Sequence, residues 1–280
     1  MTSELEIGGI RRSFTVKLPR AKARPMPLVL VLHGNGGDGS MMREWTTFDR
    51  QADEWGMAVA YPDGHEGSWA DGRGVTAADE AGVDDVAFLH AVIDWSVEQH
   101  GTAPDRTIVA GMSNGGIMAH RLALAASDQV AVLAAVAAGL PAALSGQRPT
   151  HGVSAMLING TADSLLPITG GYSRRRGPSG ELRGRTLSLQ ETADRWRAIN
   201  GCPAGPGRTR VTDASERVDV DGGVGGTQVV AWTVFGCGHT WPGTPVPGGW
   251  DEPVSLEFDA AEEICRFARP LLAPAATRLL

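Results

Sequence analysis

A serine flanked by glycines at two-residue spacing is the feature of this sequence best suited to chemistry. The run Gly111-Met112-Ser113-Asn114-Gly115-Gly116 lies between an apolar stretch at 107–110 and a stretch of helical period at 117–123. A serine in such a tight turn takes a strained positive φ, and the glycines remove Cβ atoms that would collide with the strand and the helix. The alternative is a chance match in a chain with 37 glycines. The flanking strand and helix favour a nucleophile elbow with Ser113 as nucleophile.

A serine hydroxyl needs a base to take its proton, and the base needs an acid to orient it. Asp163 follows an apolar run at 155–158, and His239 follows the last apolar run, at 229–234. The chain order serine, acid, histidine is typical of hydrolases with a nucleophile elbow. The other histidines fall in predicted helices, in loops with no strand ahead of them, or in the turn described next: His90, His100, His120, His65, His151 and His33. We therefore predict a catalytic triad of Ser113, Asp163 and His239.

Ester or amide cleavage also needs N–H groups that stabilise the developing oxyanion, each contributing about 3 to 4 kcal/mol. One is expected at the backbone of Asn114, directly after the nucleophile. The second is expected at the backbone of Asn35, within the glycine-rich turn at 33–38 that follows a strand. The alternatives for this turn are an ordinary strand-to-helix connection or a phosphate-binding loop. No Gly-Lys-Ser/Thr sequence accompanies it, which argues against phosphate.

The predicted strands and helices that must position the catalytic and oxyanion residues alternate along the chain. Apolar runs bounded by turn residues alternate with helix-period segments, including 84–100 and 259–271, which predicts a mainly parallel sheet with helices on both faces. We expect one α/β domain over residues 1–272 and a C-terminal tail at 273–280. About eight strands are expected, the first two as a hairpin: 5–7, 10–18, 28–32, 57–60, 107–110, 132–137, 155–158 and 229–234.

Composition narrows the function classes. The 280 residues are 42% hydrophobic and 20% charged, with a net charge of −7, which predicts a globular chain whose main partner is neither nucleic acid nor an anionic membrane. No apolar run approaches the roughly 20 residues of a membrane helix. Residues 1–12 lack the pattern of a secretory signal, so the default expectation is a cytoplasmic protein. The alternative is an exported protein from which the signal has been removed.

These motifs together resemble the polyhydroxybutyrate depolymerase and feruloyl esterase group of α/β-hydrolases. The resemblance covers residues 11–271 and rests on these segments: His33-Gly34, Tyr61-Pro62-Asp63-Gly64, Trp69, Asp84-Asp85-Val86, Phe88-Leu89, Gly111 to Gly116, Gly160-Thr161-Ala162-Asp163, Trp196, Asn200-Gly201-Cys202 and His239-Thr240-Trp241-Pro242-Gly243. It implies an α/β-hydrolase fold and a carboxylic ester hydrolase whose triad is Ser113, Asp163 and His239.

Two departures from the group bear on the substrate. The segment 141–152 is too short for the helical cap that many lipases insert there, which implies an open cleft. Secreted depolymerases often add a polymer-binding domain, whereas this sequence ends soon after its last predicted helix. We therefore expect soluble or oligomeric esters rather than solid polymer.

Cysteines, tryptophans and arginines leave further alternatives open. The resemblance implies a disulfide between Cys202 and Cys237, while the missing signal favours reduced thiols. Trp69 and Trp241 lie in loops expected near the cleft, where they would either sandwich a substrate group or pack in the core. Three arginines at 174–176 form either a solvated loop or a site for a substrate carboxylate. No metal-ligand spacing is present, and no metal or cofactor is expected.

The sequence thus predicts ester hydrolysis through an acyl-enzyme, on short-chain, 3-hydroxyalkanoate-oligomer or feruloyl-type aromatic esters. An acyltransferase that uses the same triad is the first alternative, because the sequence does not distinguish water from an alcohol as acceptor. A non-catalytic hydrolase-like binding protein is the remote alternative, and it normally lacks a triad residue. The expected partner is a small-molecule or oligomeric ester, and the sequence does not indicate an oligomeric state.

Overall fold

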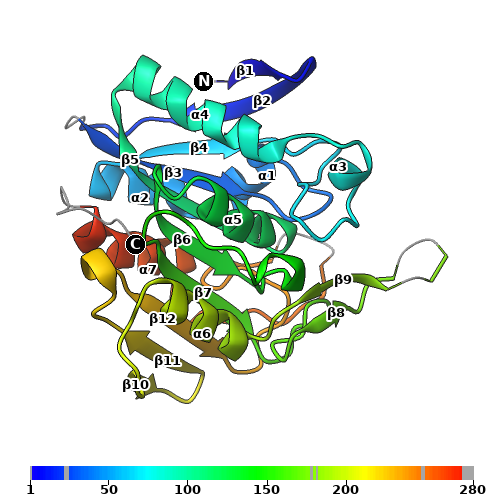
Figure 1. The fold of residues 1–280 in the computed structure, drawn as a ribbon, viewed down its shortest axis with the longest axis vertical. Helices are drawn as coiled ribbons and strands as arrows, with labels where there is room; N and C mark the ends of the chain where they lie inside the picture. The colour runs from blue at the N-terminus through cyan, green and yellow to red at the C-terminus, as the bar shows by residue number, and fades with distance from the viewer. Residues whose placement is uncertain (1, 22–24, 177–178, 181, 247–249, 273–280) are drawn as a thin grey trace.

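The computed structural model describes residues 2–21, 25–176, 179–180, 182–246 and 250–272. These residues form a central ten-stranded sheet with helices on both faces (Figure 1). The expected tail at 273–280 lies outside the described residues. Within the described residues, no helix is both long enough and apolar enough to span a bilayer.

The sheet is parallel at its centre and antiparallel at both edges. Strands β4, β3, β5, β6, β7 and β12 run parallel, β2 and β1 continue one edge, and β11 and β10 continue the other. In sheet order the strands are β1 (Thr2–Ile7), β2 (Ile10–Lys17), β4 (Ala58–Pro62), β3 (Met26–Leu32), β5 (Thr102–Met112), β6 (Val130–Val136), β7 (Ser154–Gly160), β12 (Val229–Val234), β11 (Ser215–Val220) and β10 (Arg208–Val211). Loops that follow the parallel strands therefore meet at one edge of the sheet.

Alternating side chains of the central strands supply two cores. In β3, Leu28, Leu30 and Leu32 face the core under α4, α5 and α6, whereas Val29 and Val31 face the core under α1, α2 and α7. Strands buried on both faces read as continuous apolar runs, which is why the sequence identified them. The helices are α1 (Gly39–Trp45), α2 (Phe48–Trp55), α3 (Ala77–Glu80), α4 (Asp85–His100), α5 (Asn114–Ala125), α6 (Leu189–Ile199) and α7 (Ala260–Leu271).

All eight expected strands are present, and the mainly parallel α/β sheet is confirmed. Four further strands are present: β10, β11 and the separate hairpin of β8 (Gly171–Ser173) and β9 (Arg183–Thr186). Strands β8, β9 and β10 contain only three or four residues each, and every residue of β10 is exposed, so none of these three carries an apolar run. Between β6 and β7 the described chain contains one short 3₁₀ turn, Ala142–Leu144, and no helical cap.

The disulfide that the resemblance implied is absent, because Cys202 and Cys237 are both free thiols. Cys202 packs against the core on the α4–α6 face of the sheet, and Cys237 belongs to the core on the other face. The Cys237 Sγ instead lies 3.3 Å from the Thr240 hydroxyl. Cys265 of α7 is also a buried, free thiol.

Two buried histidines make the stability depend on pH. His33 is buried, with Nε2 accepting from the Gly64 amide at 2.8 Å, and burial lowers the pKa of its imidazole. The Nδ1 of His120 accepts from the Trp196 indole at 3.1 Å, and complete burial lowers its pKa from 6.5 to about 3. The folded chain thus holds both rings neutral in a pH range where the unfolded chain would protonate them.

We therefore expect the free energy of unfolding to fall as the pH decreases from about 6.5, by at most about 1.4 kcal/mol per pH unit for each histidine. The contribution of His120 should continue down to about pH 3. Urea unfolding at pH 7.0 and pH 5.0 measures this loss. His120→Gln, which keeps a polar side chain but does not titrate, should be less stable at pH 7.0 and show a shallower pH dependence. An unchanged pH dependence in this variant would contradict the assignment.

Candidate active site

The serine motif forms the strained turn that its glycines predict. Ser113 connects β5 to α5 with φ 55° and ψ −123°, a conformation that non-glycine residues rarely adopt. A Cβ at Gly111 would collide with the Gly115 carbonyl, and one at Gly115 would collide with the His33 carbonyl. The amide of Ser113 donates to Val136 O at 2.9 Å and fixes the turn to β6. The hydroxyl is thus presented where the parallel strands end.

Asp163 and His239 are brought together by the neighbouring strands β7 and β12. The Asp163 Oδ2 lies 2.8 Å from His239 Nδ1, and both side chains are almost completely buried. The other carboxylate oxygen accepts from the amides of Leu165 at 2.8 Å and Leu166 at 2.7 Å. Because three hydrogen bonds hold the Asp163 carboxylate in place, it fixes the orientation of the imidazole and directs the ring's Nε2 away from the acid.

Ser113 lies at the same sheet edge, after β5, which is separated from β7 by β6. Among the described residues no hydrogen bond joins the Ser113 hydroxyl to the His239 ring. Catalytic hydrogen bonds are often long in unliganded enzymes and shorten in the substrate complex. The structure therefore brings the acid and base of the predicted triad into contact and places the serine at the edge that they share.

The two predicted oxyanion residues line one pocket with Ser113. Within the described residues, the backbone amides of Asn35 and Asn114 donate to no other group. The Asn114 amide belongs to the first turn of α5, where the helix dipole favours negative charge. The turn that carries Asn35 is held by a hydrogen bond from Gly36 N to Gly67 O at 2.7 Å. Both amides are available to an oxyanion beside Ser113.

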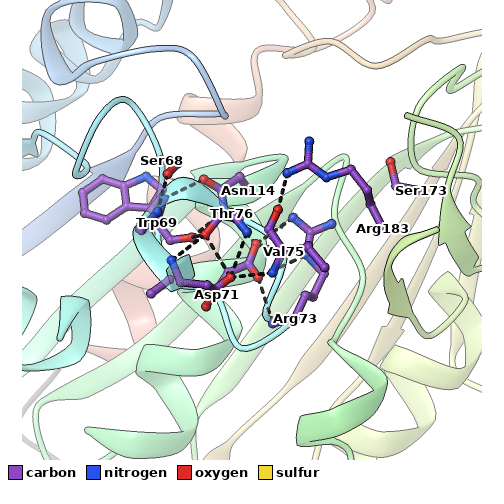
Figure 2. Close-up of polar contacts among 12 residues, drawn as sticks. Ser68, Trp69, Asp71, Arg73, Val75, Thr76, Asn114, Ser173 and Arg183 are labelled. Carbon is purple, nitrogen blue, oxygen red and sulfur yellow. Dashed lines mark hydrogen bonds and ion pairs between the residues drawn. The ribbon is translucent and has the colours of Figure 1, made fainter. Parts of the chain in front are cut away.

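The side chain of Asn114 is fixed by a polar network that sequence reasoning missed (Figure 2). Its Oδ1 accepts from the Trp69 amide at 2.8 Å, and its Nδ2 donates to Trp69 O at 3.0 Å and Asp71 Oδ2 at 2.6 Å. Asp71 is fully buried and forms an ion pair with Arg73 at 2.7 Å. The network therefore anchors the start of α5 and, through it, the Asn114 amide.

Asp71→Asn should lower kcat about tenfold with little change in KM. Losing one oxyanion donor costs about 10² to 10³ in kcat, and a displaced donor should cost less. Steady-state kinetics on a neutral ester separates the two parameters. Asp53→Asn, which removes the ion pair between Asp53 of α2 and Lys17 of β2, serves as the control and should leave both parameters unchanged. A rise in KM at constant kcat would show that Asp71 acts on substrate binding instead.

Trp69 and Trp241 are not positioned to bind substrate, because neither indole is exposed. The Trp69 Nε1 donates to His33 O at 2.9 Å and joins two loops of the site. Trp241 packs its ring edge-on against Phe48, with 5.8 Å between the ring centres. The structure therefore supports the packing alternative for both residues.

Two residues near His239 were also missed. Trp250 is 40% exposed and stacks on the His239 ring at 6.1 Å between ring centres, so an aromatic side chain with exposed surface lies beside the proposed base. Glu252 accepts from the His239 amide at 3.0 Å and from the Ser164 hydroxyl, and it joins the histidine loop to the acid loop. In the part of the chain that the structure describes, no three His, Cys, Asp or Glu side chains are grouped to hold a metal.

Comparisons with known proteins place this chain among esterases. A match to the family described as Esterase PHB depolymerase covers residues 12–165. "Putative esterase NocK" of Nocardia uniformis subsp. tsuyamanensis is 32% identical over 261 residues, which cover 87% of this chain and 74% of the relative. Feruloyl esterase C of Emericella nidulans is 25% identical over 170 residues, 58% of each chain.

The fold has solved counterparts as well. The structure of an acetyl xylan esterase from Aspergillus awamori superposes with a TM-score of 0.61 over 86% of this chain and 94% of the other, at 14% identity. That likeness establishes the α/β-hydrolase fold. With the sequence match across more than half of its length, the chain belongs to the Esterase PHB depolymerase family of carboxylic ester hydrolases.

Proposed function

We propose that this chain cleaves carboxylic esters through a covalent acyl-enzyme formed on Ser113. The observation that carries the proposal is the buried 2.8 Å pair of Asp163 and His239, at the sheet edge where the elbow presents Ser113. A buried carboxylate on His239 Nδ1 leaves the lone pair of Nε2 free to act as a base.

In the proposed first step, the Ser113 Oγ attacks the ester carbonyl while His239 Nε2 takes the hydroxyl proton. The carbonyl oxygen becomes an oxyanion that accepts from the amides of Asn35 and Asn114. His239 then gives its proton to the leaving alcohol, and the C–O bond of the ester breaks. In the second step His239 activates water, which attacks the acyl-enzyme and releases the acid and Ser113.

The proposed substrates are short-chain, 3-hydroxyalkanoate-oligomer or feruloyl-type aromatic esters. The family match and the relatives named feruloyl esterase C support this range. Trp250 supports an aromatic or flat group near the base, because its exposed ring lies beside His239.

A panel of four esters tests the proposal: p-nitrophenyl acetate, p-nitrophenyl butyrate, methyl ferulate and a 3-hydroxybutyrate trimer. We expect hydrolysis of at least one, and the preferred ester identifies the acyl class. Absence of hydrolysis on all four would overturn this substrate range.

A further inference from the structure

The pocket beside Ser113 is lined by arginines. Arg73, Arg175 and Arg183 all line it together with the nucleophile, and no aspartate or glutamate does so among the described residues. A short ester of hydrophobic acids needs no cationic group at this position, and neither step of the proposed hydrolysis uses one. The charge of this pocket therefore calls for an explanation of its own.

The positive charge of the pocket is only partly compensated. Arg73 is matched by the buried carboxylate of Asp71. Within the described residues, the guanidinium groups of Arg175 and Arg183 form no ion pair. Asp163 does not line the pocket, and His239 and two backbone amides already engage its carboxylate. A chain with a net charge of −7 thus places two uncompensated cations beside its nucleophile.

Contacts between the β8–β9 hairpin and the loop after β4 hold these arginines at the site. Arg183 donates through Nη2 to Val75 O (Figure 2). The aliphatic stem of Arg73 lies directly against Gly184, where a Cβ would collide with it. The Arg174 amide donates to Leu165 O at 2.9 Å and fixes the other strand of the hairpin to the acid loop. Arg183 uses one nitrogen for Val75 and has further donors for a ligand.

We propose that this pocket binds a carboxylate carried by the ester substrate, with Arg175 and Arg183 as specificity-determining residues. The assignment rests on the proposed esterase function and narrows its substrate class to anionic esters. A guanidinium presents paired N–H donors that match a carboxylate, and hydrogen bonds between two charged groups are about twice as strong as those between neutral groups. A neutral ester of the same size would leave both guanidinium groups without this partner.

Two matched pairs of esters test the assignment. Monomethyl glutarate carries the carboxylate on the acyl half, carboxymethyl butyrate carries it on the alcohol half, and each is compared with its primary amide. Acid release is followed by titration at low ionic strength. We expect the wild type to prefer the carboxylate in at least one pair by about a hundredfold in kcat/KM, as two charge-assisted hydrogen bonds predict. The preferred pair shows which half of the ester occupies the pocket.

Variants then assign the preference to residues. Arg175→Met and Arg183→Met should each lower the preference about tenfold while the amide esters keep their rates within about threefold. Arg183→Lys should restore part of the preference, since it keeps the charge. Arg174→Met is the matched control, because Arg174 neighbours Arg175 in sequence but does not line the pocket. Added salt should weaken the preference.

Equal rates on carboxylate and amide esters would overturn the assignment and leave the esterase function intact, provided that Ser113→Ala abolishes both rates. A preference that survives in the Arg175→Met/Arg183→Met double variant would also overturn it. If the wild type cleaves no member of either pair and no ester of the larger panel, the proposed function itself fails, and the assignment fails with it.

Discussion

Ser113→Ala should lower kcat/KM by at least about a thousandfold on every ester that the wild type cleaves. Alanine keeps the backbone turn and both oxyanion amides but has no oxygen to form the acyl-enzyme. Binding contacts are unchanged, so KM should change much less than kcat. Steady-state hydrolysis of the preferred panel ester gives both parameters, and a urea titration establishes that the variant is folded.

Ser145→Ala is the matched control for this experiment. Its hydroxyl donates to Ala142 O within the 3₁₀ turn between β6 and β7, so activity should be retained. If Ser113→Ala were as active as the wild type, the elbow would have no covalent role, and a different nucleophile would have to be sought.

Asp163→Asn should lower kcat by about 10⁴, the size of effect seen when the acid of a serine triad is replaced by its amide. The carboxamide can still accept from Leu165 and Leu166, which preserves the loop. Its NH₂ group, however, would donate to His239 Nδ1 and leave the proton on Nε2. The ring would then lack a lone pair facing Ser113.

Rates at saturating substrate measure this loss, with Asp213→Asn on an exposed turn as the control. The losses of activity caused by Ser113→Ala and by Asp163→Asn should not add in the double variant, because both residues act in the same step. A double variant much slower than Ser113→Ala alone would therefore show that Asp163 has a separate role.

The central sheet could be predicted, and a triad could be proposed, because their signals in the sequence are local. Buried parallel strands read as continuous apolar runs, and each proposed triad residue lies within five positions of the end of one of those runs. The elbow is also local, since the glycines at 111 and 115 are required by contacts within one turn and its neighbouring strand. The β10 strand carries no such signal, because all of its residues are exposed.

What the sequence could not supply are contacts between distant residues. The Asp71–Asn114 bond spans 43 positions, and nothing in either residue type marks the partner. Trp69 and Trp241 lie close to the site along the chain, but only the fold shows that their rings point into the core. The separation of Cys202 and Cys237 likewise depends on which face of the sheet each one meets.

The β8–β9 hairpin is hydrogen-bonded as a two-stranded sheet of its own, apart from the ten-stranded sheet that carries the proposed triad. In the proposed scheme, bond cleavage and the choice of substrate therefore depend on separate segments of the chain. Substitutions between residues 171 and 186 can therefore change the substrate preference during evolution while the catalytic mechanism is retained. Among related proteins, substrate selectivity should diverge faster than the catalytic mechanism. Exchanging this short segment between relatives should be a direct way to transfer substrate preference.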